Sequence, residues 1–199
     1  MLSAIDKVQK RVFDIVLSII GIVLTWWIML FAWIIASVET RSNGLFRQKR
    51  VGKEGQLFYV YKIKTMKPIA GIETSVTVSG DSRITKSGAF FRKTKIDELP
   101  QLFNVLWGTM SFVGPRPDVV GFADTLEKED RIILSLKPGI TGPASLAYKN
   151  EEIILEKQKD PENYNREVIW PDKIRINKKY IHEWSLKKDI LYIIKTITG

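Results

Sequence analysis

The chain has 199 residues, enough for one domain with a sizeable hydrophobic core and an appended element. It carries 31 lysine and arginine residues against 22 aspartate and glutamate residues. The resulting net charge of +9 favours an anionic partner such as nucleic acid, acidic lipid or a phosphorylated substrate. Because there is no cysteine, disulfides, thiolate nucleophiles and zinc–thiolate sites are excluded.

The first predicted element is a membrane helix. Residues 15–38 contain no charged residue and, at about 1.5 Å per helical residue, are long enough to cross a hydrocarbon core of about 30 Å. The segment is too long for a cleaved signal peptide, and no clear small-x-small cleavage site follows it.

Basic residues lie on both sides of this segment. They precede it at Lys7, Lys10 and Arg11 and follow it at Arg41, Arg47, Lys49, Arg50 and Lys53. Because such residues prefer the cytoplasmic side of a membrane, we expect a helix that enters the bilayer and turns back, with a spanning helix as the alternative. The turn requires a break with compensating hydrogen bonds, for which Ser18, Gly21 and Thr25 are the candidates.

A β-hairpin is predicted next. Residues 57–63 are β-prone and partly alternating, and Gly52 and Gly55 flank the expected turn. Lys62 and Lys64 then lie on one face of the second strand, where they either form a solvated edge or bind phosphate. Residues 67–88 are rich in Gly, Ser and Thr and are predicted to be a loop with short extended pieces.

Two adjacent carboxylates, Asp97 and Glu98, mark the predicted start of a short amphipathic helix. Its apolar face recurs at helical spacing as Leu99, Leu102, Phe103 and Leu106. Pro100 fits the first turn, and the helix dipole favours ionised carboxylates there. The basic residues just before the pair, Arg92, Lys93 and Lys95, favour the same ionised forms and can recruit phosphates. Taken alone, the pair is explained by an ordinary helix start.

Arg116 lies between Pro115 and Pro117, which constrain its backbone. It is either part of an ordinary turn or a rigidly presented anion ligand. Beyond it we predict a helix over residues 119–136, turns in LKPGITGP, a surface loop over residues 159–171 and a basic amphipathic helical tail. The single histidine, His182, has no partners at fixed spacing and is predicted to be a surface or hydrogen-bonded residue.

Several motifs occur together in one order along the chain. KRVFD precedes the apolar segment, FRQKRVG and YKIKTM follow it, and then come DSRITKSG, FRKTKIDELPQLFNVLWGTMSFVGPRP, KPGITG and SLKKDILYIIKTI. Together they closely resemble the bacterial sugar transferases known as monotopic phosphoglycosyl transferases, over nearly the whole chain. The block from DELPQ to GPRP is the most specific part of the resemblance.

The elements and the resemblance together predict an α+β fold. We expect a mainly helical, membrane-associated single domain with an N-terminal, re-entrant hydrophobic helix, a small β-hairpin and amphipathic interfacial helices. Residues 1–40 would form the membrane helix. Residues 41–199 would form the membrane-surface catalytic domain at the cytoplasmic face of the bacterial inner membrane, in one continuous structural unit.

The resemblance implies transfer of a phosphosugar from a UDP-sugar to a polyprenol phosphate such as undecaprenyl phosphate, with release of UMP. This reaction is the first membrane step of a bacterial glycan assembly pathway. Asp97 matches the family nucleophile, which forms a covalent phosphosugar intermediate. Glu98 matches the glutamate associated with Mg²⁺, and Asp97 is a second candidate ligand for the metal.

Three basic residues, Lys62, Arg92 and Arg116, match basic family positions around the phosphates, and Lys149 is a further candidate for binding phosphate or substrate. Lys149 stands where a better-known subgroup has arginine. Lysine keeps the positive charge but lacks the planar guanidinium group that can bind a phosphate through two hydrogen bonds. A second departure is Trp26-Trp27, which stands where the family's re-entrant helix has a Ser-Pro break.

The alternative function is a non-catalytic, membrane-anchored basic module that binds anionic lipid or nucleic acid. The lysines and aromatic residues of FYVYKIKTM are compatible with it. It leaves DELPQ and GPRP without a purpose, so the enzyme is favoured and no nucleic acid partner is expected.

Overall fold

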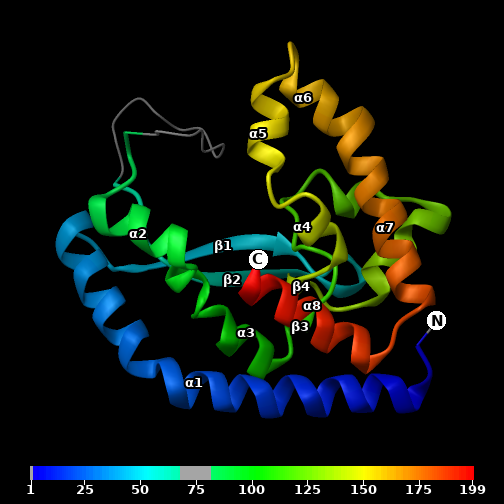
Figure 1. The fold of residues 1–199 in the computed structure, drawn as a ribbon, viewed down its shortest axis with the longest axis horizontal. Helices are drawn as coiled ribbons and strands as arrows, with labels where there is room; N and C mark the ends of the chain where they lie inside the picture. Colours follow the sequence, from blue (N-terminus) through cyan, green and yellow to red (C-terminus); the bar gives the residue numbers. More distant parts are fainter. Residues whose placement is uncertain (1, 68–81) are drawn as a thin grey trace. The chain divides into compact units, whose positions relative to one another are not determined.

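The computed structural model describes residues 2–67 and 82–199, which pack into two compact units. The first unit comprises Met1–Val16, Lys49–Phe58 and Val105–Gly199, and the second comprises Leu17–Gln48 and Tyr59–Asn104. Helices dominate the described residues, and the strands form two small two-stranded sheets (Figure 1). The predicted α+β class is therefore confirmed, whereas the division into 1–40 and 41–199 stays a prediction.

The N-terminal helix α1, Ala4–Thr40, is long and apolar enough by length and composition to cross a membrane. Its polarity is inverted relative to a helix of a soluble protein. Lys10, Asp14 and Ser18 are buried, whereas large apolar side chains are exposed along its length, among them Val8, Val12, Val16, Val23, Leu24, Trp26 and Phe31. Such a surface is typical of a helix whose outer face contacts lipid rather than water. The predicted long apolar helix is confirmed.

Helix α1 runs without interruption through the residues expected to break it. The Thr25 hydroxyl donates to the Gly21 carbonyl oxygen at 2.7 Å, and the Trp27 indole donates to the Leu24 carbonyl oxygen at 3.0 Å. Side chains that bind backbone carbonyls in this way compete with the helical hydrogen bonds and often bend a helix. Re-entry into the membrane stays a prediction.

The hairpin is confirmed at the predicted residues. Strand β1, Leu45–Val51, and strand β2, Leu57–Ile63, are hydrogen-bonded neighbours joined by a tight turn over Lys53–Gly55. The turn uses left-handed backbone, with φ of +58° at Glu54 and +81° at Gly55. Glycine adopts this conformation without the steric cost of a side chain, which explains why the turn needs Gly55.

The core of the first unit lies around a second small sheet. Strand β3, Ser111–Val113, pairs in parallel with β4, Gly139–Thr141. Five helices follow: α4 (Pro143–Ala147), α5 (Glu151–Glu156), α6 (Pro161–Tyr164), α7 (Trp170–His182) and α8 (Leu186–Thr198) (Figure 1). Val113 of β3 belongs to a buried cluster with residues that include Ile133, Leu136, Ile174 and Ile181. The cluster fixes β3 at the centre of this unit.

The second unit contains helix α2, Lys86–Thr94, and the beginning of helix α3, Gln101–Trp107. Ala32 and Ala36 of α1 pack there with Ile63 and Phe91. The Thr85 hydroxyl caps α2 by accepting a hydrogen bond from Gly88 N at 2.9 Å. A Cβ on Gly88 would lie 2.2 Å from the Thr65 carbonyl oxygen, so glycine permits the close approach of α2 to the end of β2.

Two predicted elements are wrong. Residues 119–136 do not form one helix but contain two 3-10 segments, Ala123–Thr125 and Lys128–Ser135. Positive φ angles at Gly121 and Lys128 interrupt the helix there. Residues 159–171 are not a loop but are largely helical, because Asp160 caps α6 by accepting from Asn163 N and Pro161 occupies the first turn.

The basic tail forms two helices, α7 and α8, rather than one, and Ser185 caps the second by accepting from Lys188 N. The predicted loop over residues 67–88 falls mostly on residues 68–81, which lie outside the described residues. On its described flanks, Met66 and Ile84 form an antiparallel bridge, and α2 begins at Lys86.

Candidate active site

The acidic pair lies in a short turn between two helices. Lys95 ends α2 in a left-handed conformation with φ of +59°, and Ile96–Glu98 then form a single 3-10 turn before α3 begins at Gln101. The pair therefore precedes the helix instead of occupying its first turn. This geometry corrects the prediction of a simple acidic helix start and places Asp97 where its side chain is buried.

Asp97 carries an orphaned oxygen. Its Oδ1 atom is buried and has no hydrogen-bond partner among the residues that the structure describes. Buried polar atoms are nearly always satisfied, because leaving one without a partner costs about 1–3 kcal/mol. An oxygen held in this state is available to a ligand or to chemistry.

Burial raises the pKa of Asp97, and the negative charge of Glu98 raises it further. The positive charges of Lys62, Lys95 and Arg92 act in the opposite direction. The basic neighbours thus favour the ionised carboxylate as expected, but burial and Glu98 shift the pKa of Asp97 upward overall, which the sequence did not predict. Desolvation raises the pKa of Asp97 more than the basic side chains lower it, and a bound cation would lower the pKa further.

Glu98 is paired with Lys62. The Lys62 ammonium on β2 donates to Glu98 Oε1 at 2.7 Å, and both side chains are partly buried. Lys62 is therefore part of the acidic site rather than a solvated edge lysine. The neighbouring Lys64 instead donates to the Ser42 hydroxyl at 2.9 Å.

Asn104 of α3 holds the site together and was missed by the sequence reasoning. Its buried amide donates to the Tyr59 carbonyl oxygen at 2.7 Å and accepts from Tyr61 N at 3.2 Å. One side chain thus satisfies the backbone of β2 immediately before Lys62 and sets α3 against that strand. An asparagine within the predicted apolar helix was the signal that could have revealed this role.

Arg92 is oriented by the YKIKTM segment. Its Nε donates to the Thr65 hydroxyl at 3.1 Å, and its Nη2 contacts Met66 Sδ at 3.6 Å. An arginine has five N–H donors, so these contacts fix the guanidinium while leaving donors for a phosphate. The second unit thus brings together Lys62, Arg92, Asp97 and Glu98.

Arg116 belongs to the first unit, where its backbone is clamped and its side chain is exposed. Gly114 N donates to the Thr141 carbonyl oxygen at 2.9 Å, and the Pro115 carbonyl oxygen accepts from Gly139 N at 2.8 Å. On the other side, Val51 N donates to the Asp118 carbonyl oxygen at 2.9 Å. The backbone around Arg116 is therefore constrained, as the two flanking prolines predict, and its role as an anion ligand stays a prediction.

Asp118, next to this loop, is a pH-sensitive group. Burial raises its pKa to about 6, although the positive charges of Lys173, Arg116 and Arg50 lower it. The folded protein therefore keeps a proton on Asp118 between about pH 4 and pH 6 that the unfolded chain releases, so this residue lowers stability as the pH rises through that window.

Asp118→Asn should remove this effect. We expect the variant to gain about 1–3 kcal/mol over the wild-type protein at pH 7.5 and little at pH 4. Urea unfolding at the two pH values measures the difference. Glu156→Gln, at an exposed carboxylate of α5, is the control and should change stability little at either pH. An equal effect of Asp118→Asn at both pH values would contradict the prediction.

Lys149 also belongs to the first unit, where it is exposed and donates to the carbonyl oxygen of Gly199. His182 is exposed, as predicted for a residue without a catalytic role. The expected contact of Lys149 with a phosphate or sugar stays a prediction.

The carboxylates near Asp97 are potential ligands for Mg²⁺. No group of three or more aspartate, glutamate or histidine side chains suited to a metal occurs within residues 2–67 and 82–199. Magnesium in phosphoryl-transfer sites is usually held by one or two carboxylates together with substrate phosphates and water. Asp97 and Glu98 supply two adjacent carboxylates, one with an orphaned oxygen, so they fit a magnesium ion that arrives with a phosphate.

Comparison with known families decides what kind of protein carries this site. Residues 5–199 match the family described as bacterial sugar transferase. The chain belongs to the bacterial sugar transferase family. The match covers both units, including the acidic turn and the Arg116 loop, and confirms the family resemblance of the motifs.

Individual bacterial sugar transferases show the same similarity. Undecaprenyl-phosphate galactose phosphotransferase of Salmonella typhimurium is 35% identical over 96% of the chain and 40% of its own length. UDP-glucose:undecaprenyl-phosphate glucose-1-phosphate transferase of Klebsiella pneumoniae is 35% identical over 98% of the chain and 41% of its own length. The chain thus spans about two fifths of these relatives. Sugar transferase EpsL of Bacillus subtilis, itself uncharacterized, is 30% identical over 96% of the chain and 86% of its own length.

Proposed function

We propose that this bacterial sugar transferase moves a phosphosugar from a UDP-sugar to a polyprenol phosphate, such as undecaprenyl phosphate, and releases UMP. The observation that carries the proposal is the buried Asp97, whose Oδ1 atom lacks a partner in the described part of the chain while Lys62, Lys95 and Arg92 act on its charge. The names of the two relatives that act on undecaprenyl phosphate support the same reaction class.

In the proposed first step, Asp97 Oδ1 attacks the β-phosphorus of the UDP-sugar. An acyl-phosphate bond forms, the bond from the β-phosphorus to the bridging oxygen breaks, and UMP leaves with that oxygen. In the second step, an oxygen of the polyprenol phosphate attacks the same phosphorus and the acyl-phosphate bond breaks, which restores Asp97. A carboxylate nucleophile thereby divides one difficult displacement into two easier ones.

A carboxylate that approaches a diphosphate is repelled by its negative charge, and the basic side chains would offset this repulsion. Lys62 and Arg92 would bind phosphate oxygens in the second unit, and Arg116 and Lys149 are proposed as further ligands of the nucleotide sugar. Glu98, together with Asp97, would hold Mg²⁺, which when bound offsets the charge that develops on the leaving phosphate.

A substrate screen tests the function. Full-length protein in lipid nanodiscs would be given Mg²⁺, undecaprenyl phosphate and a panel of UDP-sugars, and UMP release would be measured. Release with one or a few sugars, dependent on the lipid phosphate, is the expected result. Salt-sensitive binding of nucleic acid without turnover of any UDP-sugar would instead support the non-catalytic module.

We further propose that the enzyme works at the cytoplasmic face of the bacterial inner membrane and that both flanks of α1 lie in the cytosol. Because the sequence has no cysteine, Ser3→Cys and Asn43→Cys each introduce a single labelling site. We expect both positions to be protected from a membrane-impermeant maleimide in intact cells and labelled after lysis. Labelling of position 3 alone in intact cells would show that the helix spans the membrane.

A further inference from the structure

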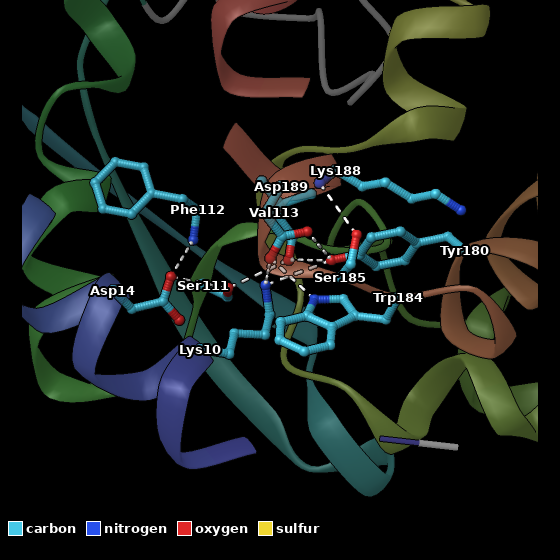
Figure 2. A network of polar contacts seen from close by, with 10 residues as sticks. All are labelled: Lys10, Asp14, Ser111, Phe112, Val113, Tyr180, Trp184, Ser185, Lys188 and Asp189. Carbon is cyan, nitrogen blue, oxygen red and sulfur yellow. Dashed lines mark hydrogen bonds and ion pairs between the residues drawn. The ribbon is translucent and has the colours of Figure 1, made fainter. Parts of the chain in front are cut away.

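Asp14 is a buried carboxylate on α1 that the proposed chemistry does not use. Its Oδ1 atom accepts hydrogen bonds from the Ser111 hydroxyl at 3.1 Å and from Phe112 N at 3.0 Å (Figure 2). Both donors belong to strand β3, and all three residues lie in the first unit. The apolar helix therefore makes a specific polar contact with this short strand.

Strand β3 leads directly into the loop that carries Arg116. Ser111 N donates to the Pro138 carbonyl oxygen at 2.9 Å, which fixes the inner edge of β3 against the segment that enters β4. Phe112 N points the other way, toward α1, and Asp14 is its acceptor (Figure 2). The strand is thus held on both edges at Ser111 and Phe112, five and four residues before the exposed Arg116.

The attachment of α1 to the rest of the unit does not require Asp14. Lys10 already binds Asp189 of α8 at 2.6 Å, and Arg11 donates to the carbonyl oxygens of Val105 and Leu106 at 2.7 and 2.8 Å. These contacts attach the adjacent turn of α1 to α8 and to the end of α3. What Asp14 adds is a pair of hydrogen bonds to the edge of β3 that faces α1.

We propose that Asp14 is a positioning residue for Arg116: by accepting from Ser111 and Phe112 it fixes β3 and thereby the site at which the loop presents its arginine to a nucleotide diphosphate. The inference rests on the proposed function, because it takes Arg116 to be a phosphate ligand. It also links a residue of the apolar helix to nucleotide binding.

Binding of UDP, measured by calorimetry on full-length protein in nanodiscs, tests the inference without requiring turnover. Asp14→Ala removes the acceptor and should weaken UDP binding about tenfold, as should Arg116→Ala. In the Arg116→Ala background, Asp14→Ala should have less than about a twofold further effect, because the two residues act through one contact. Asp14→Asn keeps an Oδ1 acceptor and should restore most of the affinity.

Ser185→Ala is the matched control. It removes the cap of α8 in the same unit without touching β3, so it should lower thermal stability and leave UDP affinity unchanged. Equal weakening by Ser185→Ala, wild-type affinity in Asp14→Ala, or multiplicative effects of the Asp14 and Arg116 variants would each overturn the inference. Failure of the wild-type protein to bind UDP would overturn the proposed function and the inference together.

Discussion

Asp97→Asn should abolish both UMP release and the phosphosugar adduct, lowering turnover by at least about 10³-fold. The amide has nearly the same shape but is a poor nucleophile, and no other described carboxylate has a buried oxygen without a partner. Initial rates with the preferred UDP-sugar, and intact-protein mass spectrometry after reaction without the lipid acceptor, measure the two losses.

The stability of the same variant separates lost chemistry from misfolding. Because burial raises the pKa of Asp97, a neutral amide removes a poorly solvated charge, and the free energy of unfolding at neutral pH should be unchanged or higher. Glu156→Gln, at an exposed carboxylate, is the activity control and should keep wild-type turnover. Full activity of Asp97→Asn would remove Asp97 as the nucleophile.

Lys10→Met should lower the free energy of unfolding by about 3–5 kcal/mol. The Lys10 ammonium binds Asp189 Oδ2 at 2.6 Å, and the two side chains are only 8% and 0% exposed. Asp189 also accepts from the Tyr180 hydroxyl at 2.7 Å and the Trp184 indole at 3.0 Å (Figure 2). Removing the lysine leaves this carboxylate buried without its cation, which is costlier than the loss of the attraction alone.

Urea unfolding in a mild detergent measures this cost, and the chain supplies a matched control. Lys188 binds Glu183 at 2.9 Å, but their side chains are 39% and 50% exposed, so Lys188→Met should cost less than about 1 kcal/mol. Asp189→Asn, added to Lys10→Met, should restore part of the loss because it removes the uncompensated charge. Similar small losses in Lys10→Met and Lys188→Met would contradict the prediction.

Local patterns in the sequence predicted the elements whose structure depends on near neighbours. The hairpin over residues 45–63 follows from alternating β-prone residues around two glycines, and α1 follows from an uninterrupted apolar run. The errors arose where local cues conflict. Gly121 and a left-handed Lys128 break an apparent helix, whereas capping by Asp160 extends helical structure into a polar segment that resembles a loop.

The acidic pair shows the same division between what local sequence predicts and what depends on distant residues. The ordered set of motifs, of which the block from DELPQ to GPRP is the most specific, identified the family and singled out Asp97, Glu98 and Arg116, because each motif is a short continuous stretch of the chain. Burial depends on residues that are distant in the sequence, so the sequence did not reveal the desolvation that raises the pKa of Asp97. The contact of Asn104 with the backbone of β2 was missed for the same reason.

By itself, then, the sequence determined the membrane-type helix, the hairpin, the α+β class and the family, since each depends on the order and spacing of residues. Only the tertiary structure decided that Asp97 has an orphaned oxygen, that Lys62 pairs with Glu98, and that Lys10 and Asp14 turn inward from an apolar helix. Those features depend on which side chains meet across long sequence separations, and on the water that these contacts exclude.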